Sequence, residues 1–570
     1  MMRPFSRTRL FFVVAVIIAL SGVVLAQLVR LQVVEHDRWD HVARQGRAGQ
    51  REVTPERGRI WDRNGVLLVG NEPRFAVWVD REAVKNDVDV LMRDIVPILD
   101  LKPDEVRAAL NGDQVYVLLK TDLPAALGER LIAKNVRGMD VVPYWRRHYP
   151  ERSLAANVLG FYNAEGKGYY GLEGFYDAVL AGEEHVFEED QDVWRDRLPL
   201  DAPPDSLVPR GADLVLTIDR TVQMIVEEEL TLALETTGAE SGIIIVMDPR
   251  TGEILAMASA PSYDPNAYTD TASQDPDRFV NPAVSGSYEP GSVFKIVTLA
   301  AALDVGLVAP DTTYFDTACL EVGGQPLCNW DRKEHGVVSM VELMAKSLNV
   351  GAATLSTRMG APTFYTYVRA FGFGQAMGID LQGEAIGRMR IPTDVDWYES
   401  DLGTNAFGQG LSATPLQVIA AVAAVANEGV LVRPHVVKAI VDRDRVREAQ
   451  WVETGRPIRA ETARTLTNVL VEAVAREVPQ ALVPGYRVAG KTGTSQIPIA
   501  GGYDDPWTIA SFVGYGPASD PRLIILVRLD RPTISPWGAD TAAPVFQHVA
   551  ARLFAVLGIA PDGPAEASNQ

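Results

Sequence analysis

Lysine and cysteine are scarce in this 570-residue chain, and positive charge is scarce relative to negative charge. Each shortage limits the classes of function that the sequence allows. The 74 acidic residues outnumber the 54 basic ones, which gives a formal net charge of −20. That balance excludes the clustered positive potential of a nucleic-acid-binding surface, so we expect no nucleic-acid partner. Only ten of the basic residues are lysines, so a lysine inside a motif carries more weight here than in an ordinary sequence.

Signatures of metal and nucleotide sites are missing as well. The seven histidines are scattered without the spacing of metal ligands. The stretch Gly166-Lys167-Gly168 lacks the Ser/Thr and the spacing of a phosphate-binding loop. We therefore predict no metal and no cofactor.

The two cysteines, Cys319 and Cys328, flank a stretch with Gly323-Gly324 at its centre. A two-residue Gly-Gly turn predicts a hairpin that sets the cysteines directly opposite each other. They could form a disulfide if the site is oxidising, or remain a pair of semi-buried thiols if it is not. The residues alone leave both alternatives open.

One long apolar run, from Leu10 to Ala26, carries no charge, and Gln27-Leu28-Val29 extends it. Its length is close to the lower limit for crossing a bilayer as a helix. Arginines precede the run and no acid does, so the tendency for positive charge to stay inside predicts a cytoplasmic N-terminus and an extracytoplasmic remainder. The alternative is a cleavable signal peptide. Apolar residues that continue at helical spacing past the run favour an uncleaved anchor.

Strand and turn signals divide the rest of the chain. Asn64-Gly65 is a strong hairpin turn signal, residues 80–140 mix helix and strand patterns, and the Pro- and Asp-rich residues 199–211 are typical of a linker. From Asp213 the pattern predicts a strand, a helix and then two strands joined by a turn, 242–247 and 253–258. The fold class is therefore α+β or mixed α/β.

The first of three short catalytic elements is Pro290-Gly291-Ser292-Val293-Phe294-Lys295, which an apolar helical run follows. Ser292 would lie at a helix start, where free amides and the helix dipole favour developing negative charge. Lys295 is three residues further on and shares its helix face. A serine becomes a strong nucleophile when a base takes its proton, and a lysine can do so only if it is neutral. Burial or a second cation nearby would lower its pKa.

The second element is Ser347-Leu348-Asn349 and the third is Lys491-Thr492-Gly493-Thr494. The Ser347 hydroxyl could relay a proton, and the Asn349 amide could hold Lys295 or the substrate backbone. The third element, at a strand edge, could receive an extended peptide as an additional strand. Gly493 would leave room for that approach, and Lys491 would supply a cation for a carboxylate.

Together the three elements resemble the serine-x-x-lysine, serine–asparagine and Lys-Thr-Gly signature of penicillin-binding proteins and serine β-lactamases. Further stretches extend the resemblance to class B penicillin-binding proteins over nearly the whole chain: 57–65, 147–150, 171–174, 281–283, 288–291, 408–410 and 414–417. The resemblance implies a single N-terminal transmembrane helix, an elongated pedestal, and a transpeptidase domain with a central antiparallel sheet flanked by helices. The boundaries we predict are a cytoplasmic tail 1–9, the helix 10–30, the pedestal 31–210, the transpeptidase 213–560 and a C-terminal tail 561–570.

By this resemblance, Ser292 attacks the penultimate D-alanine of a stem peptide and Lys295 is the general base. Ser347 and Asn349 assist proton transfer and orientation. Lys491 and Thr494 hold the terminal carboxylate, and the strand residues Thr492 and Gly493 complete the substrate-binding edge. The backbone amides of Ser292 and Thr494 would form the oxyanion hole, and β-lactams would trap Ser292.

The stretch Lys346-Ser347-Leu348-Asn349-Val350-Gly351 resembles the division branch of the family, and so does 510–514. Elongation-branch relatives more often carry an aspartate in the middle element. No segment before residue 210 resembles a glycan-polymerising domain, so the resemblance implies a SEDS-family membrane glycosyltransferase and divisome proteins as partners. Three alternatives stay open: a β-lactamase or β-lactam sensor on the same scaffold, a non-catalytic scaffold, and a soluble carboxypeptidase.

Overall fold

The computed structural model describes residues 7–31, 35, 48–53, 55–182, 185–190, 210–443, 445–499 and 502–563. The chain divides into two compact units, one of residues 1–56 with 181–211 and one of residues 57–180 with 212–570. Most of the predicted linker 199–211 lies outside the described residues, as does most of the predicted C-terminal tail. The linker and the five boundaries therefore stay predictions.

The smaller unit contains helix α1 (Arg7–Val29) and a pair of strands, β1 (Ala48–Val53) and β8 (His185–Asp190), which run antiparallel. Within α1, Phe11–Val29 has a mean hydropathy of 2.7 and is not buried against other parts of the chain. Exposed apolar side chains around a whole helix are stable in lipid and not in water, so this helix fits a membrane anchor.

The pedestal part of the larger unit contains three long strands of a larger sheet. The long strand β3 (Leu67–Asp80) pairs antiparallel with β4 (Tyr116–Pro124) on one side and β5 (Met139–His148) on the other. Alternate residues of β3, such as Val77 and Val79, are buried in a core with helices α4 (Pro103–Leu110) and α5 (Ala125–Ile132). The Asn64-Gly65 turn joins β2 (Ile60–Trp61) to β3, so the predicted hairpin is confirmed.

Three pedestal stretches that carry the family resemblance meet at one buried carboxylate. Glu173, on helix α7 (Gly171–Phe175), is fully buried and accepts hydrogen bonds from Arg57 Nε and Arg147 Nε at 2.7 Å each. Burial by itself raises the pKa of Glu173, but the attraction of Arg147 and Arg57 outweighs it, so the pKa of this carboxyl is lowered. These hydrogen bonds therefore connect three segments of the pedestal that are far apart in the sequence.

The catalytic part is built on a five-stranded antiparallel sheet in the order β11-β10-β22-β21-β20. Its strands are β10 (Ser241–Met247), β11 (Ile254–Ala260), β20 (Ala489–Ile499), β21 (Gly502–Gly516) and β22 (Leu523–Asp530). Along β10, Ile243 and Ile245 face one core while Ile244 and Val246 face a second one. Both faces of the sheet are therefore covered, which explains why β10, β11 and β22 are nearly continuous apolar runs.

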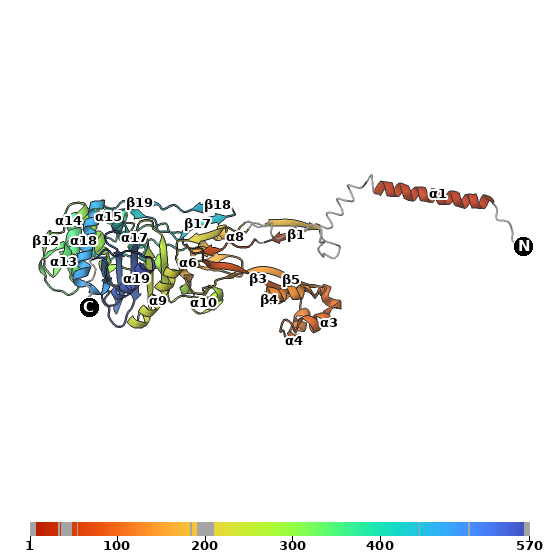
Figure 1. The fold of residues 1–570 in the computed structure, drawn as a ribbon, viewed down its shortest axis with the longest axis horizontal. Helices are drawn as coiled ribbons and strands as arrows, with labels where there is room; N and C mark the ends of the chain where they lie inside the picture. Colours follow the sequence, from red (N-terminus) through yellow and green to blue (C-terminus); the bar gives the residue numbers. More distant parts are fainter. Residues whose placement is uncertain are drawn as a thin grey trace. The chain divides into compact units, whose positions relative to one another are not determined.

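Helices cover the two faces. On one face lie α9 (Arg220–Thr237) and α19 (Ala542–Val556), which contact each other (Figure 1). On the other face lies a larger group: α12 (Lys295–Asp304), α13 (Met340–Ala345), α14 (Asn349–Met359), α15 (Ala361–Ala370), α16 (Glu399–Asn405), α17 (Pro415–Ala426) and α18 (Ala460–Glu477). The α+β class and the central antiparallel sheet are confirmed.

The pedestal and the catalytic part share a second sheet, in the order β18-β17-β9-β2-β3-β4 with β5 beside β3. Strand β9 (Asp213–Leu216) pairs in parallel with β2 and antiparallel with β17 (Val437–Asp442), which in turn pairs with β18 (Arg445–Glu448). A continuous ladder of backbone hydrogen bonds therefore joins the two parts.

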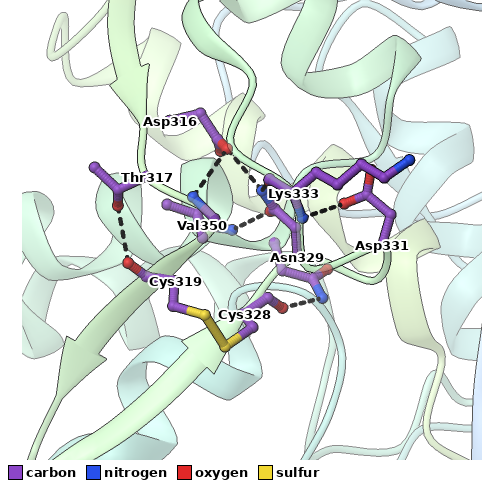
Figure 2. The surroundings of a disulfide bond; sticks show 10 residues. Asp316, Thr317, Cys319, Cys328, Asn329, Asp331, Lys333 and Val350 are labelled. Atoms are coloured by element: carbon purple, nitrogen blue, oxygen red, sulfur yellow. Dashed lines mark hydrogen bonds between the residues drawn. A yellow bond between two sulfur atoms is a disulfide. The ribbon is translucent and has the colours of Figure 1, made fainter.

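The remaining feature that positions the site is a small hairpin of β13 (Cys319–Val322) and β14 (Gln325–Cys328). Its register places Cys319 opposite Cys328, as predicted, and Gly323 and Gly324 both have positive φ at the turn. The two sulfurs are joined in a disulfide (Figure 2).

Candidate active site

The candidate nucleophile lies on a tight turn that precedes a helix. Ser292 is part of the 3₁₀ turn η7 (Gly291–Phe294), and the α-helix α12 begins at Lys295. The candidate nucleophile therefore lies three residues before the start of the α-helix. Gly291 has φ +58°, and a side chain there would lie 3.0 Å from the carbonyl oxygen of Thr494. Glycine is therefore needed both for the backbone conformation and for the close approach of β20.

The Lys295 amine lies at the centre of the site, fully buried. Its Nζ lies within hydrogen-bond distance of four oxygens: Ser292 Oγ at 3.0 Å, the Ser347 carbonyl at 2.6 Å, Ser347 Oγ at 3.1 Å and Asn349 Oδ1 at 2.8 Å. Burial lowers the pKa of this lysine well below its ordinary value, and the positive charge of Lys491 lowers the pKa further. Both influences that the residue pattern suggested act on this amine, and both favour its neutral form.

The second element connects α13 to α14 in a strained conformation. Ser347 has φ +57°, which is uncommon for a residue with a side chain and turns both its carbonyl and its hydroxyl toward Lys295. Asn349 is the first residue of α14, and its Nδ2 donates to the Cys328 carbonyl at 3.0 Å. The amide group is therefore held from both sides, by Lys295 and by the disulfide hairpin.

The third element lies on β20, which is an edge strand of the five-stranded sheet. Lys491 is only 3% exposed, its Nζ donates to the carbonyl and the hydroxyl of Thr492, and burial lowers its pKa to about 7. Thr494 is half-buried and its Oγ1 accepts a hydrogen bond from the Gly538 amide at 3.2 Å. Strand β20 packs directly on η7, so the first and third elements are neighbours.

The role of Gly493 in leaving room for a substrate stays a prediction, and the structure gives a further reason for glycine at this position. A side chain at Gly493 would lie 2.4 Å from Ser511 Oγ, 2.9 Å from Val293 and 3.1 Å from the Pro290 carbonyl. The missing side chain is therefore needed for packing between β20, β21 and η7. Gly493 contributes to the site because it allows this packing, which brings the third element to the nucleophile.

Two tryptophans that the motif reasoning missed lie beside the site. Trp330 donates from Nε1 to the carbonyl of Lys346, and Trp537 precedes the glycine whose amide binds Thr494. Their rings meet edge-on with centroids 5.3 Å apart, although both remain about half exposed. They come from loops distant in sequence, and no periodic pattern would have paired them.

Known proteins share the domains and the fold of this chain. Residues 242–551 match the penicillin binding protein transpeptidase domain and residues 52–193 match the penicillin-binding protein dimerisation domain. Stage V sporulation protein D of Bacillus subtilis is 34% identical over 97% of this chain and 86% of its own length. PbpB of Mycobacterium tuberculosis is 34% identical over 94% of this chain and 83% of its own length. The crystal structure of penicillin binding protein 3 from Mycobacterium tuberculosis, complexed with aztreonam, has a TM-score of 0.69 at 31% identity and covers 90% of this chain and 99% of that one.

Fold and family together define a serine-type acyltransferase that acts on peptidoglycan. The chain belongs to the class B penicillin-binding proteins, and its activity is that of a peptidoglycan D,D-transpeptidase. Its apolar N-terminal helix fits the membrane anchoring of such proteins.

Proposed function

We propose that Ser292 is the residue acylated by the stem peptide and that neutral Lys295 is its general base. The observation that carries this proposal is the 3.0 Å contact between Lys295 Nζ and Ser292 Oγ, made by an amine whose pKa is strongly lowered. A buried neutral amine at hydrogen-bond distance is the arrangement that activates a serine hydroxyl.

In the first half of the reaction, Lys295 takes the Ser292 proton while Oγ attacks the carbonyl carbon of the penultimate D-alanine. The amides of Ser292 and Thr494 stabilise the oxyanion. The peptide C–N bond then breaks, and the leaving nitrogen of the terminal D-alanine receives a proton through the Ser347 hydroxyl, which lies 3.1 Å from the same amine. In the second half, an amine of a neighbouring stem peptide attacks the ester carbonyl carbon and gives a proton to the base. The ester C–O bond then breaks, and the base returns a proton to Ser292 Oγ.

Lys491 and Thr494 are proposed to bind the terminal carboxylate along the β20 edge. With a pKa near 7, Lys491 is about half charged at neutral pH in the free protein. An arriving carboxylate would raise this pKa and keep the ammonium charged. Asn349 is proposed to hold Lys295 in place through its 2.8 Å contact.

Mass spectrometry of the penicillin-treated protein tests the nucleophile. The acyl adduct should map to the peptide that contains Ser292 and should be missing in Ser292→Ala. An adduct on another residue would overturn the proposal. The lifetime of the adduct distinguishes a transpeptidase, which stays labelled, from a β-lactamase, which hydrolyses the adduct quickly. Transfer of the acyl group to water in place of an amine would indicate carboxypeptidase activity.

We further propose that the enzyme acts in septal synthesis, with its catalytic part outside the cytoplasm and with a SEDS-family polymerase and divisome proteins as partners. The division-like stretch 346–351 supports this choice, together with the predicted anchor orientation. Depletion should give filaments with incomplete septa, whereas round cells with normal septa would indicate the elongation branch.

A further inference from the structure

We propose that the disulfide hairpin β13–β14 is a positioning device for the catalytic centre, acting through the backbone carbonyl of Cys328 on Asn349. The inference rests on the proposed roles of Ser292 and Lys295. It adds to them a covalent element outside the three motifs that determines how firmly the Lys295 amine is held.

An unbroken series of contacts links the disulfide to the nucleophile. The Cys328 carbonyl accepts from Asn349 Nδ2 at 3.0 Å, and Asn349 Oδ1 accepts from Lys295 Nζ at 2.8 Å. The same amine lies 3.0 Å from Ser292 Oγ. Because an amide group is rigid and planar, fixing its nitrogen side on the hairpin also fixes the oxygen that orients the amine.

The residue after Cys328 strengthens the link. Asn329 Oδ1 accepts from the Val350 amide at 3.1 Å, and Asn329 Nδ2 donates to Asp316 Oδ1 at 2.7 Å (Figure 2). Val350 lies in the first turn of α14, where backbone amides have no partner within the helix. The end of β14 therefore holds the start of α14 at two points, one on the backbone and one on the Asn349 side chain.

The disulfide supports a hairpin whose strands pair with no further strand in the described part of the chain, although helices α14 and α16 contact them. The hairpin forms a two-stranded sheet of its own, and each strand has four residues. An isolated hairpin of this size is marginally stable in water. Buried Val322, beside the turn, and buried Leu327, beside Cys328, pack against α16. The disulfide closes the open end of the hairpin, where the Cys328 carbonyl lies.

The disulfide can be opened selectively. Cys319 is exposed, and the chain has no other cysteines than this pair, so a thiol reagent has a single target. Dithiothreitol supplies two electrons and two protons, so that the S–S bond is replaced by two thiols and the reagent leaves as its cyclic disulfide. Reduction should slow acylation by a fluorescent penicillin about tenfold, which corresponds to a rise of about 1.4 kcal/mol in the activation free energy when the amine is held less firmly. The double variant Cys319→Ser/Cys328→Ser should show the same slow rate and no response to dithiothreitol.

A comparison with Asn349→Ala separates positioning from general stabilisation. If the hairpin acts through Asn349, reduction should leave the acylation rate of this variant unchanged, because the two changes remove the same interaction. Equal slowing in wild type and Asn349→Ala would show a general structural role and overturn the inference, as would an unchanged rate in reduced wild type. Thiol titration confirms each redox state, and melting curves confirm that each form is folded at the assay temperature. If oxidised wild type fails to acylate Ser292 at all, the proposed function itself is wrong.

Discussion

Replacing Lys491 by methionine should make the protein more stable and less reactive at the same time. Burial lowers the pKa of this lysine to about 7, against 10.5 for the free side chain. At pH 7 that difference corresponds to about 4 kcal/mol of stability lost in the folded state. The substitution also removes the hydrogen bonds of Nζ to Thr492. Their loss costs about 2 kcal/mol and offsets part of the gain in stability. We therefore expect a net gain of about 2 kcal/mol.

The pH dependence of this gain has a definite sign. The unfolded chain keeps the Lys491 proton up to about pH 10.5, whereas the folded protein releases it above about pH 7. The unfolded state thus binds more protons between these values, so the stability of wild type rises with pH across this window. The advantage of Lys491→Met should be fully present below pH 7 and should shrink toward pH 10.

Thermal denaturation at pH 6.5 and pH 9 measures the stability of Lys491→Met, and acylation by a fluorescent penicillin measures its reactivity. Loss of the cation that binds the carboxylate should slow acylation 10- to 100-fold, as expected for a charged hydrogen bond worth about 1.5–3 kcal/mol. Lys438→Met is the matched control, because Lys438 is exposed on β17 and should change neither quantity. A variant less stable than wild type at pH 6.5 would refute the reasoning that burial of this amine is costly.

Two further substitutions test the framework around the site. Gly291→Ala places a carbon 3.0 Å from the Thr494 carbonyl at φ +58°, so we expect about 1–3 kcal/mol of destabilisation and slower acylation in the same two assays. Glu173→Ala leaves the buried Arg57 and Arg147 without their shared carboxylate, which should cost about 3–5 kcal/mol in urea denaturation. Because the pKa of Glu173 is lowered in the fold, its contribution in wild type should be present above the ordinary pKa of 4.5 and be lost as the pH falls through the lowered value.

The sequence predicted features that depend on short-range patterns. The turns at Asn64-Gly65 and Gly323-Gly324 and the strands 242–247 and 253–258 are present, because turn residues and short apolar runs are local properties of the sequence. The left-handed backbone of Ser347 was not predictable, since it is imposed by contacts with Lys295 from another helix. The Trp330–Trp537 contact was missed for a related reason: only the folded sheet brings those loops together.

The choice between lysine and arginine provides a last test of the mechanism. Of the ten lysines, Lys295 and Lys491 are buried and the other eight are exposed or half-buried, in a chain that uses arginine for most of its positive charge. Arginine forms better buried ion pairs, as at Arg57 and Arg147, but its guanidinium stays protonated in proteins and cannot act as a base. A buried lysine is useful where the group must become neutral. Lys295→Arg keeps hydrogen-bond donors at this position but makes the group permanently charged, so it should slow acylation by about 10²–10⁴-fold, the usual contribution of a general base. Near-normal acylation at any pH between 6 and 9 would mean that the amine holds the site together without ever accepting the serine proton.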